Sequence, residues 1–197
     1  MNSEKKSNKS IYAPLGASNH SQYERGKLDY YATHPSAVPD LLKYESFQEQ
    51  IWEPACGECH LVKPLREAGH EVYATDIVDR GFNDDTFDFL KQERQWHGDI
   101  VTNPPYKYAD KFVNKAMESI QEGGKVAMFL KLTFLESQKR KKLFDKYPPK
   151  FIYVYRKRQR VAKNGDSRMF QKSSAVCYAW FIWSRGFGGE PVIRWIE

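Results

Sequence analysis

The sequence has few cysteines and no long hydrophobic run. Only three of its 197 residues are cysteine, an odd and small number that argues against a disulfide framework. No run of 18 apolar residues occurs, and the N-terminal segment MNSEKKSNKS lacks the apolar stretch of a secretory signal. We therefore expect a cytoplasmic protein without a membrane span, whose stability comes from burial of a core.

Length and composition fit one globular domain. Hydrophobic residues make up 41% of the chain and charged residues 28%, close to the averages for folded proteins. The first 25 residues are polar and show no sustained apolar period. We predict a mobile arm at 1–25 and a single domain at 26–197.

The positive charge is concentrated in one segment. The net charge is +6, but the segment 138–172 alone holds 13 Lys and Arg against two Asp, which leaves −5 for the rest. A solvated basic face is the usual explanation of such a run. Here the basic residues interleave with Tyr147, Tyr153, Tyr155 and Phe170, and phosphate contacts combined with ring stacking are typical of nucleic-acid binding. The residues that we predict to contact phosphate are Arg156, Lys157, Arg158, Arg160, Lys163 and Arg168.

Short apolar runs alternate with helical patterns from Tyr30 onward. The predicted strands are IWEPA, EVYATDI, DIVTNPP, KVAMFLK, FIYVYRK and AVCYAWFIW, and the predicted helices are PSAVPDLLKY, LVKPLREAG and ADKFVNKAMESI. This rhythm predicts an α/β fold with a mainly parallel sheet and helices on both faces. A basic loop at about 156–174 joins the last two strands without a helical pattern, which predicts an antiparallel pair. We expect Trp180, Trp183 and Trp195, in the tail, to fill a core.

Acidic residues follow the first two predicted strands. Glu53 ends one strand and is followed by a tight turn through Gly57. Asp76 ends the next strand, 19 residues after Gly57, where a carboxylate can accept hydrogen bonds from both hydroxyls of a ribose. The turn lacks the complete G-x-G-x-x-G pattern and, taken alone, is typical of any tight βα connection. Together the two acids predict an adenosine-containing cofactor.

Cys56 and Cys59 form a C-x-x-C pattern in the same turn. Such a pattern occurs in redox pairs and in halves of zinc sites. The sequence contains no second C-x-x-C and no H-x-x-x-H to complete a metal site. We therefore expect no metal ion and favour a structural explanation for the two cysteines.

The segment DIVTNPPY ends a strand at two prolines, which cannot continue a central ladder. The side-chain oxygen of Asn103 can accept one hydrogen of an exocyclic amine and the carbonyl of Pro104 the other, while Tyr106 stacks on the ring. An isolated Asn-Pro turn needs no function. Its place 27 residues beyond Asp76 in an alternating chain favours a site for a planar amino-bearing base that attacks an electrophilic methyl group.

With the motifs NPPY at 103–106 and EPACG at 53–57, and with Asp76, the chain from about Lys27 to Glu197 resembles the S-adenosylmethionine-dependent amino-methyltransferases. It is most similar to the N6-adenine DNA methyltransferases and their small phage-type members. The resemblance implies a Rossmann-like fold with a mixed seven-stranded sheet whose last strand is antiparallel, and S-adenosylmethionine as cofactor. The catalytic residues that it implies are Asn103, Pro104, Pro105 and Tyr106.

The resemblance also implies cofactor contacts. By it, Asp88 accepts a hydrogen bond from the cofactor's adenine amino group, Phe89 packs on the adenine ring, and Tyr31 and Thr33 contact the methionine part; His34 stands where the family usually has proline. The implied cofactor-binding residues are Tyr31, Thr33, Glu53, Ala55, Cys56, Gly57, Asp76, Ile77, Asp88, Phe89 and Asn103. The chain has no room for the large target-recognition region of restriction-type relatives, so specificity is expected from loops.

These observations predict methyl transfer to the N6 amino group of adenine, with duplex DNA as the expected partner and the target base flipped out of the helix. Two alternatives keep the chemistry: adenine in RNA, or a glutamine side chain of a protein. The basic segment favours nucleic acid over a protein carboxamide and does not separate DNA from RNA. A third alternative is a non-catalytic nucleic-acid-binding module with the same fold.

Overall fold

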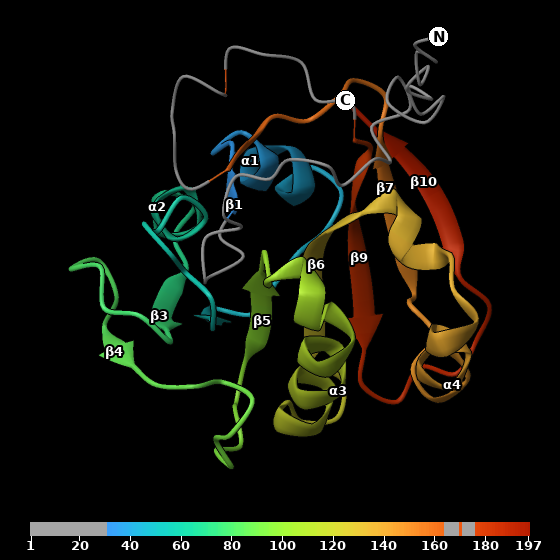
Figure 1. Cartoon of the computed structure of the whole chain (residues 1–197), viewed down its shortest axis with the longest axis horizontal. Coiled ribbons are helices and arrows are strands. Elements are labelled where there is room, and N and C mark those ends of the chain that lie inside the picture. The colour runs from blue at the N-terminus through green and yellow to red at the C-terminus, as the bar shows by residue number, and fades with distance from the viewer. Residues whose placement is uncertain (1–30, 164–169, 171–175) are drawn as a thin grey trace, which may run out of the picture.

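The computed structural model describes residues 31–163, 170 and 176–197 (Figure 1). The predicted arm at 1–25, Arg168 and most of the predicted basic loop after residue 163 lie outside these residues. Within the described part of the chain, no helix is long and apolar enough to cross a membrane.

An eight-stranded sheet forms the centre of the fold, in the order β10-β7-β9-β6-β5-β2-β3-β4. Its strands are β2 (Gln50–Glu53), β3 (Glu71–Asp76), β4 (Asp85–Thr86), β5 (Asp99–Thr102), β6 (Lys125–Lys131), β7 (Phe151–Tyr155), β9 (Tyr178–Ser184) and β10 (Val192–Ile196). All six predicted strands are present. Strand β9 runs antiparallel to both β6 and β7, which confirms the predicted antiparallel pair, and the other neighbours are parallel.

The sheet differs from the prediction in two respects: it has eight strands instead of seven, and its last strand is parallel. The antiparallel strand is β9, and β10 follows it at the edge, pairing in parallel with β7 through Val192 and Phe151. Because β9 runs against the other strands, it ends near the start of β7, so a short connection suffices.

Trp195 lies on β10 and is 58% exposed, whereas Trp180 and Trp183 are fully buried, so the expected core role is wrong for Trp195.

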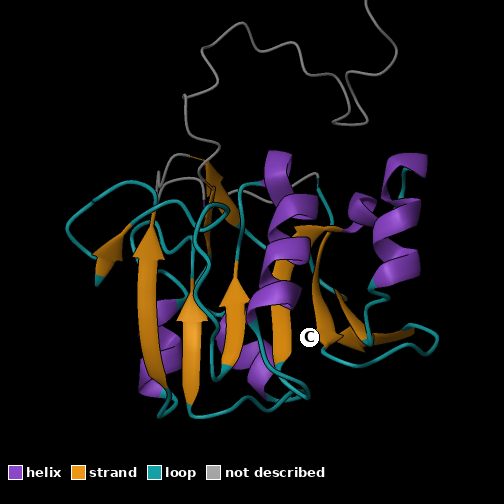
Figure 2. Ribbon diagram, turned by 90° about the horizontal axis from the view of Figure 1, so that it is seen from below, coloured by secondary structure: helices purple, strands orange, loops and turns teal. Residues whose placement is uncertain are grey.

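Helices cover both faces of the sheet (Figure 2), as predicted. The helices α1 (Ala37–Leu42) and α2 (Val62–Glu67) pack on one face, and α3 (Ala109–Ser119) and α4 (Lys141–Lys146) pack on the other. Side chains alternate between these two cores along the inner strands, from β7 to β3 in the sheet order. In β2, Ile51 belongs to the α1–α2 core and Trp52 to the α3–α4 core. In the described part of the chain there are also three short 3-10 helices, η2 (Tyr106–Tyr108), η3 (Leu132–Leu135) and η4 (Gln138–Arg140).

A second, two-stranded sheet was not predicted. Strand β1 (Tyr31–Thr33) pairs antiparallel with β8 (Val161–Lys163), with Tyr31 opposite Lys163. The predicted basic loop therefore contains a strand near its beginning. This pairing brings the segment before α1 against residues that lie 130 positions later in the chain.

The carboxyl ends of the parallel strands bring three predicted site residues and one lysine to the same edge of the sheet. Glu53 and Asp76 end β2 and β3, Asn103 directly follows β5, and Lys131 ends β6. In open α/β sheets, ligands bind outside the carboxyl ends of the strands. A ligand site is therefore expected at this edge.

Candidate functional site

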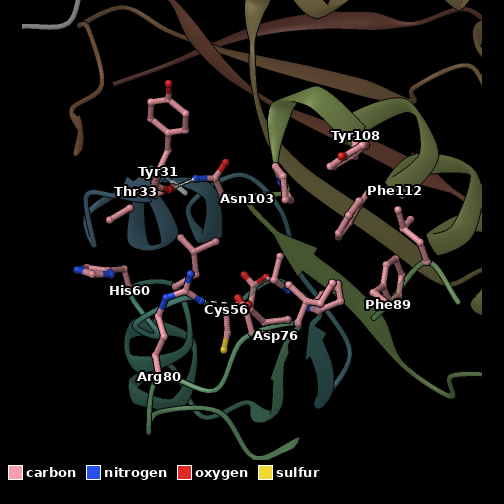
Figure 3. Close-up of a pocket in the computed structure, with 18 of the residues that line it drawn as sticks. Tyr31, Thr33, Cys56, His60, Asp76, Arg80, Phe89, Asn103, Tyr108 and Phe112 are labelled. Atoms are coloured by element: carbon pink, nitrogen blue, oxygen red, sulfur yellow. Dashed lines mark hydrogen bonds and ion pairs between the residues drawn. The ribbon is translucent and has the colours of Figure 1, made fainter. Parts of the chain in front are cut away.

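A cavity of about 410 Å³ lies at the carboxyl edge of the sheet (Figure 3). Its size falls within the range of about 300–1,000 Å³ that is typical of small-molecule sites. The predicted site residues that line it are Tyr31, Thr33, Glu53, Ala55, Cys56, Asp76, Ile77, Asp88, Phe89, Asn103 and Pro105. Gly57, Pro104 and Tyr106 are not among its lining residues.

Eight further residues of the described ranges line the cavity, and they were not predicted as site residues from the sequence. They are Ala32, Pro54, His60, Leu61, Arg80, Leu90, Tyr108 and Phe112. Two signals were available in the sequence. Arg80 follows the strand-end acid Asp76 by four residues, and Tyr108 and Phe112 follow the proline pair at helical spacing.

The carboxylate of Asp76 organises the turn after β2. Its Oδ2 accepts a hydrogen bond from the backbone N–H of Gly57 at 2.8 Å, and Gly57 adopts a positive φ of 56°. Its Oδ1 accepts from the backbone N–H of Val78 at 2.9 Å and from the Arg80 guanidinium at 3.1 Å. Because a carboxylate offers about four acceptor positions, one position on Oδ2 remains for a ligand hydroxyl. Acceptance from two hydroxyls requires Arg80 to move away.

Glu53 is buried at the same edge, with 1% of its surface exposed. Its Oε1 accepts a hydrogen bond from the backbone N–H of Ala55 at 3.1 Å. Burial raises the pKa of Glu53 to about 8, because desolvation penalises the charged carboxylate. A cationic group in the cavity would favour the ionised form of this side chain.

Asp88 and Phe89 form another part of the wall. The Oδ1 of Asp88 accepts from the backbone N–H of Leu90 at 3.0 Å. The Phe89 ring is buried edge-on against Trp52, with 5.1 Å between the centroids. Ile77 is 57% exposed and also lines the cavity. These apolar side chains give the cavity surfaces against which a planar ring can pack.

Asn103 is fixed by two hydrogen bonds to β1 (Figure 3). Its Nδ2 donates to the carbonyl oxygen of Tyr31 at 2.7 Å and to the hydroxyl of Thr33 at 2.8 Å. A carbonyl can only accept, so the atom facing Tyr31 must be the amide nitrogen. Among the described residues, the Oδ1 of Asn103 has no hydrogen-bond partner although it is buried.

The prolines end β5 as predicted, and Tyr106 begins η2 directly after them. The Tyr106 ring packs against Tyr31 and Tyr178 at centroid distances of 5.3 and 5.9 Å. The Nζ of Lys131 lies 4.9 Å from the centre of the Tyr106 ring. Burial raises the pKa of Tyr106 well above its usual value. Tyr106 is thus part of an aromatic cluster beside Asn103 rather than part of the cavity wall.

The predicted phosphate-binding residues begin at the same edge of the sheet. Strand β7 runs in the direction of β6 and ends at Tyr155, and the next five residues include Arg156, Lys157, Arg158 and Arg160, all of them exposed. Arg156 pairs with Glu197 at 3.4 Å, and the Arg160 carbonyl accepts from the His34 backbone N–H at 3.2 Å. Lys163 is the last residue of β8. The edge that holds the cavity therefore carries a cluster of positive charge.

The C-x-x-C cysteines lie in the turn after β2. All three cysteines of the chain carry free thiols, with Cys56 buried, Cys59 partly exposed and Cys177 exposed. In the part of the chain that the structure covers, no three His, Cys, Asp or Glu side chains gather as a group that could hold a metal ion.

The strand order and the cavity at the strand ends invite comparison with solved structures. A predicted O-methyltransferase from Agrobacterium tumefaciens superposes with a TM-score of 0.56 at 11% identity, over 74% of this chain and 78% of that protein. A Listeria monocytogenes protein described as a class I S-adenosylmethionine-dependent methyltransferase gives 0.52 at 13% identity, over 81% and 62%. The fold is that of the class I methyltransferases.

A third similar structure is the M protein of the type I restriction enzyme EcoKI. Its TM-score is 0.51 at 16% identity, over 78% of this chain and 43% of that protein. The present chain thus spans less than two thirds of the Listeria protein and of the M protein. The sequence matches no protein-family profile and no curated protein.

Proposed function

We propose that this chain transfers the methyl group of S-adenosylmethionine to the N6 amino group of adenine in DNA. The observation that carries the proposal is the Oδ1 of Asn103, a buried acceptor without a partner among the described residues, at the carboxyl end of β5. An unpaired buried acceptor is costly, by about 1–3 kcal/mol, so its retention here favours a ligand donor.

The cavity residues fit S-adenosylmethionine. Asp76 retains an acceptor position for a ribose hydroxyl, and the apolar surfaces of Ile77 and Phe89 suit an adenine ring. Glu53 is a carboxyl group whose ionised form a cationic amine or sulfonium would favour. When bound, the cofactor supplies an electrophilic methyl group.

Asn103 and Pro104 act on the acceptor amine. The Oδ1 of Asn103 accepts one amine hydrogen, which raises the electron density on nitrogen and directs its lone pair toward the cavity. The Pro104 carbonyl is proposed to accept the second hydrogen. The Asn103 oxygen is buried in this structure, so the base reaches it only when the side chains over it shift. Tyr106, three residues later, is then available to stack on the base.

Nucleic acid is supported as the substrate class by the charge at this edge. The exposed residues after the carboxyl end of β7, Arg156, Lys157, Arg158 and Arg160, are proposed to contact the phosphates beside a flipped base. The M protein of a restriction enzyme has the same fold, so the fold itself is compatible with DNA as acceptor.

The test is transfer of labelled methyl groups to duplex DNA, RNA and protein in separate reactions. N6-methyladenine in hydrolysed DNA supports the proposal. Label in RNA or in protein glutamine identifies one of the alternative acceptors. Methylcytosine as product, or cofactor binding without transfer to any of the three, overturns it, and the second result favours the non-catalytic binding module.

A further inference from the structure

The turn C-G-E-C at 56–59 brings two thiols together at the wall of the cavity. The backbone N–H of Cys59 donates to the carbonyl of Cys56 at 2.8 Å and closes a four-residue turn. In such a turn the outer Cα atoms lie within about 7 Å, and disulfides join Cα atoms about 4.4–6.8 Å apart. The backbone therefore already satisfies the first requirement for a disulfide.

Cys59 occupies an unusual backbone position. Its φ is 60°, in the left-handed region that side chains with a Cβ rarely adopt, and only Ser137 shares a positive φ among the described non-glycine residues. Glycine would adopt this conformation without strain. A thiol is thus present where the backbone itself favours glycine.

The two thiols differ in a way that suits a nucleophile and its resolving partner. Cys59 is partly exposed and Cys56 is buried. A hydrogen bond from Cys56 lowers the pKa of the Cys59 thiol, and the positive charge of Arg66 acts in the same direction. The same hydrogen bond and burial raise the pKa of Cys56. Cys59 is therefore the thiol that an external disulfide meets first.

We propose that Cys56 and Cys59 form a reversible disulfide on exposure to a low-molecular-weight disulfide such as glutathione disulfide, and that the closed pair weakens cofactor binding. The Cys59 thiolate attacks one sulfur of glutathione disulfide, forms a mixed disulfide and releases one glutathione. Cys56 then loses its proton, attacks the Cys59 sulfur and releases the second glutathione. The two cysteines are oxidised by two electrons and one glutathione disulfide is reduced to two thiols.

Closure acts on the cavity through two contacts. Cys56 itself lines the cavity. The Cys59 Sγ donates to the carbonyl of Phe82 at 3.1 Å, in the loop that also carries Arg80. A disulfide sulfur has no proton to donate, so oxidation removes this contact between the turn at 56–59 and the loop that carries Phe82 and Arg80. This consequence rests on the proposed cofactor site.

The first measurement is the mass of the full chain after treatment with glutathione disulfide. We expect a loss of two hydrogen atoms, located by peptide mapping to the single tryptic peptide that contains both cysteines. Cys56→Ser should trap glutathione on Cys59, Cys59→Ser should leave residue 56 unmodified, and Cys177→Ser, the control, should still close the disulfide. The proposal is overturned if glutathione is found only on Cys177. It is also overturned if the chain without substitutions keeps a stable glutathione adduct on Cys59.

The second measurement compares S-adenosylmethionine binding by reduced and oxidised protein in calorimetry. We expect oxidation to weaken binding about three- to tenfold, as for loss of one hydrogen bond, and dithiothreitol to restore it. Cys59→Gly should show no response to the oxidant. Unchanged affinity after disulfide closure overturns the inference, whereas a reduced protein that binds no cofactor overturns the proposed function instead.

Discussion

The side-chain amide of Asn103 donates a 2.7 Å hydrogen bond to the carbonyl of Tyr31, a residue 72 positions earlier in the chain. The ring of Tyr31 also packs against Tyr106 at 5.3 Å. One short strand thus contacts two of the four residues of the NPPY motif. Because Tyr31 pairs with Lys163 of β8, β1 also connects the NPPY motif to the first half of the basic loop.

Asn103→Ala should lower single-turnover methyl transfer by roughly two to three decades, the scale for loss of one preorganised polar group. Cofactor affinity should change little. The matched control is Thr33→Val, which removes one acceptor of the Asn103 amide and leaves its Oδ1 in place. We expect the rate of methyl transfer by the control to fall by less than about tenfold, the effect of one weakened hydrogen bond. Equal losses in both variants would assign Asn103 to anchoring of β1.

Tyr106→Ala should cost about 1–3 kcal/mol of base stacking, measured as weaker binding of DNA that contains an unpaired adenine. Tyr106→Phe should keep most of the affinity and activity, because the ring provides the stacking surface. A Phe variant as weak as the Ala variant would show that the hydroxyl, and not the ring, makes the contact.

Asp76→Ala should weaken cofactor binding by about 1.5–3 kcal/mol, since it removes a charged acceptor. Arg80→Ala should change the affinity by less than about threefold, because it frees an acceptor on Asp76 while removing a cation near the ligand. Calorimetry on the two variants provides the comparison. A loss in Arg80→Ala as large as that in Asp76→Ala would make the guanidinium the principal binding group.

Glu53 should make stability depend on pH. Its pKa in the folded protein is about 8, above the usual 4.5, so the folded state binds more protons than the unfolded chain between these values. The stabilisation is complete below about pH 4.5 and is lost as the pH rises through 8. The free energy of unfolding should therefore fall by roughly 1 kcal/mol per pH unit in this range.

Glu53→Gln should remove this part of the pH dependence, because the amide does not ionise. Urea unfolding of both proteins between about pH 5 and 8 measures it. Glu118→Gln, on the exposed side of α3, is the control for the change of residue type. The same slope for Glu53→Gln and the unmodified chain would contradict the assigned pKa.

The basic residues after β7 should give DNA binding a steep salt dependence. If all six predicted residues neutralise phosphates, the slope of log affinity against log salt should be about −5. Replacing Lys157 and Arg158 by Ala should reduce its size by about 1.8. Replacing Lys141 and Lys142, exposed on α4 before β7 begins, should leave the slope unchanged. Equal effects of the two double variants would show that binding follows overall charge.

Local sequence was sufficient for the sheet interior and for the acids at its edge. Alternation of strand and helix patterns placed Glu53, Asp76 and Asn103 at successive strand ends, and parallel strands necessarily bring those ends to one side. The cavity then forms between them. Gly57 was also correctly predicted to lie in a tight turn, because glycine adopts a positive φ more readily than residues with a Cβ.

Other features depended on contacts between distant residues. Strands β1 and β8 have three residues each, too short for a periodic signal, and they form because they pair with each other. Arg80 enters the site because its guanidinium reaches Asp76, and Tyr106 turns into an aromatic cluster with Tyr31 and Tyr178. Periodicity reports which side of an element is apolar, but not which distant partner covers it. The sequence alone determined the order of strands, helices and strand-end acids, whereas only tertiary packing decided which side chains surround the cavity, that Trp195 lies exposed on an eighth strand, and which way the Asn103 amide faces.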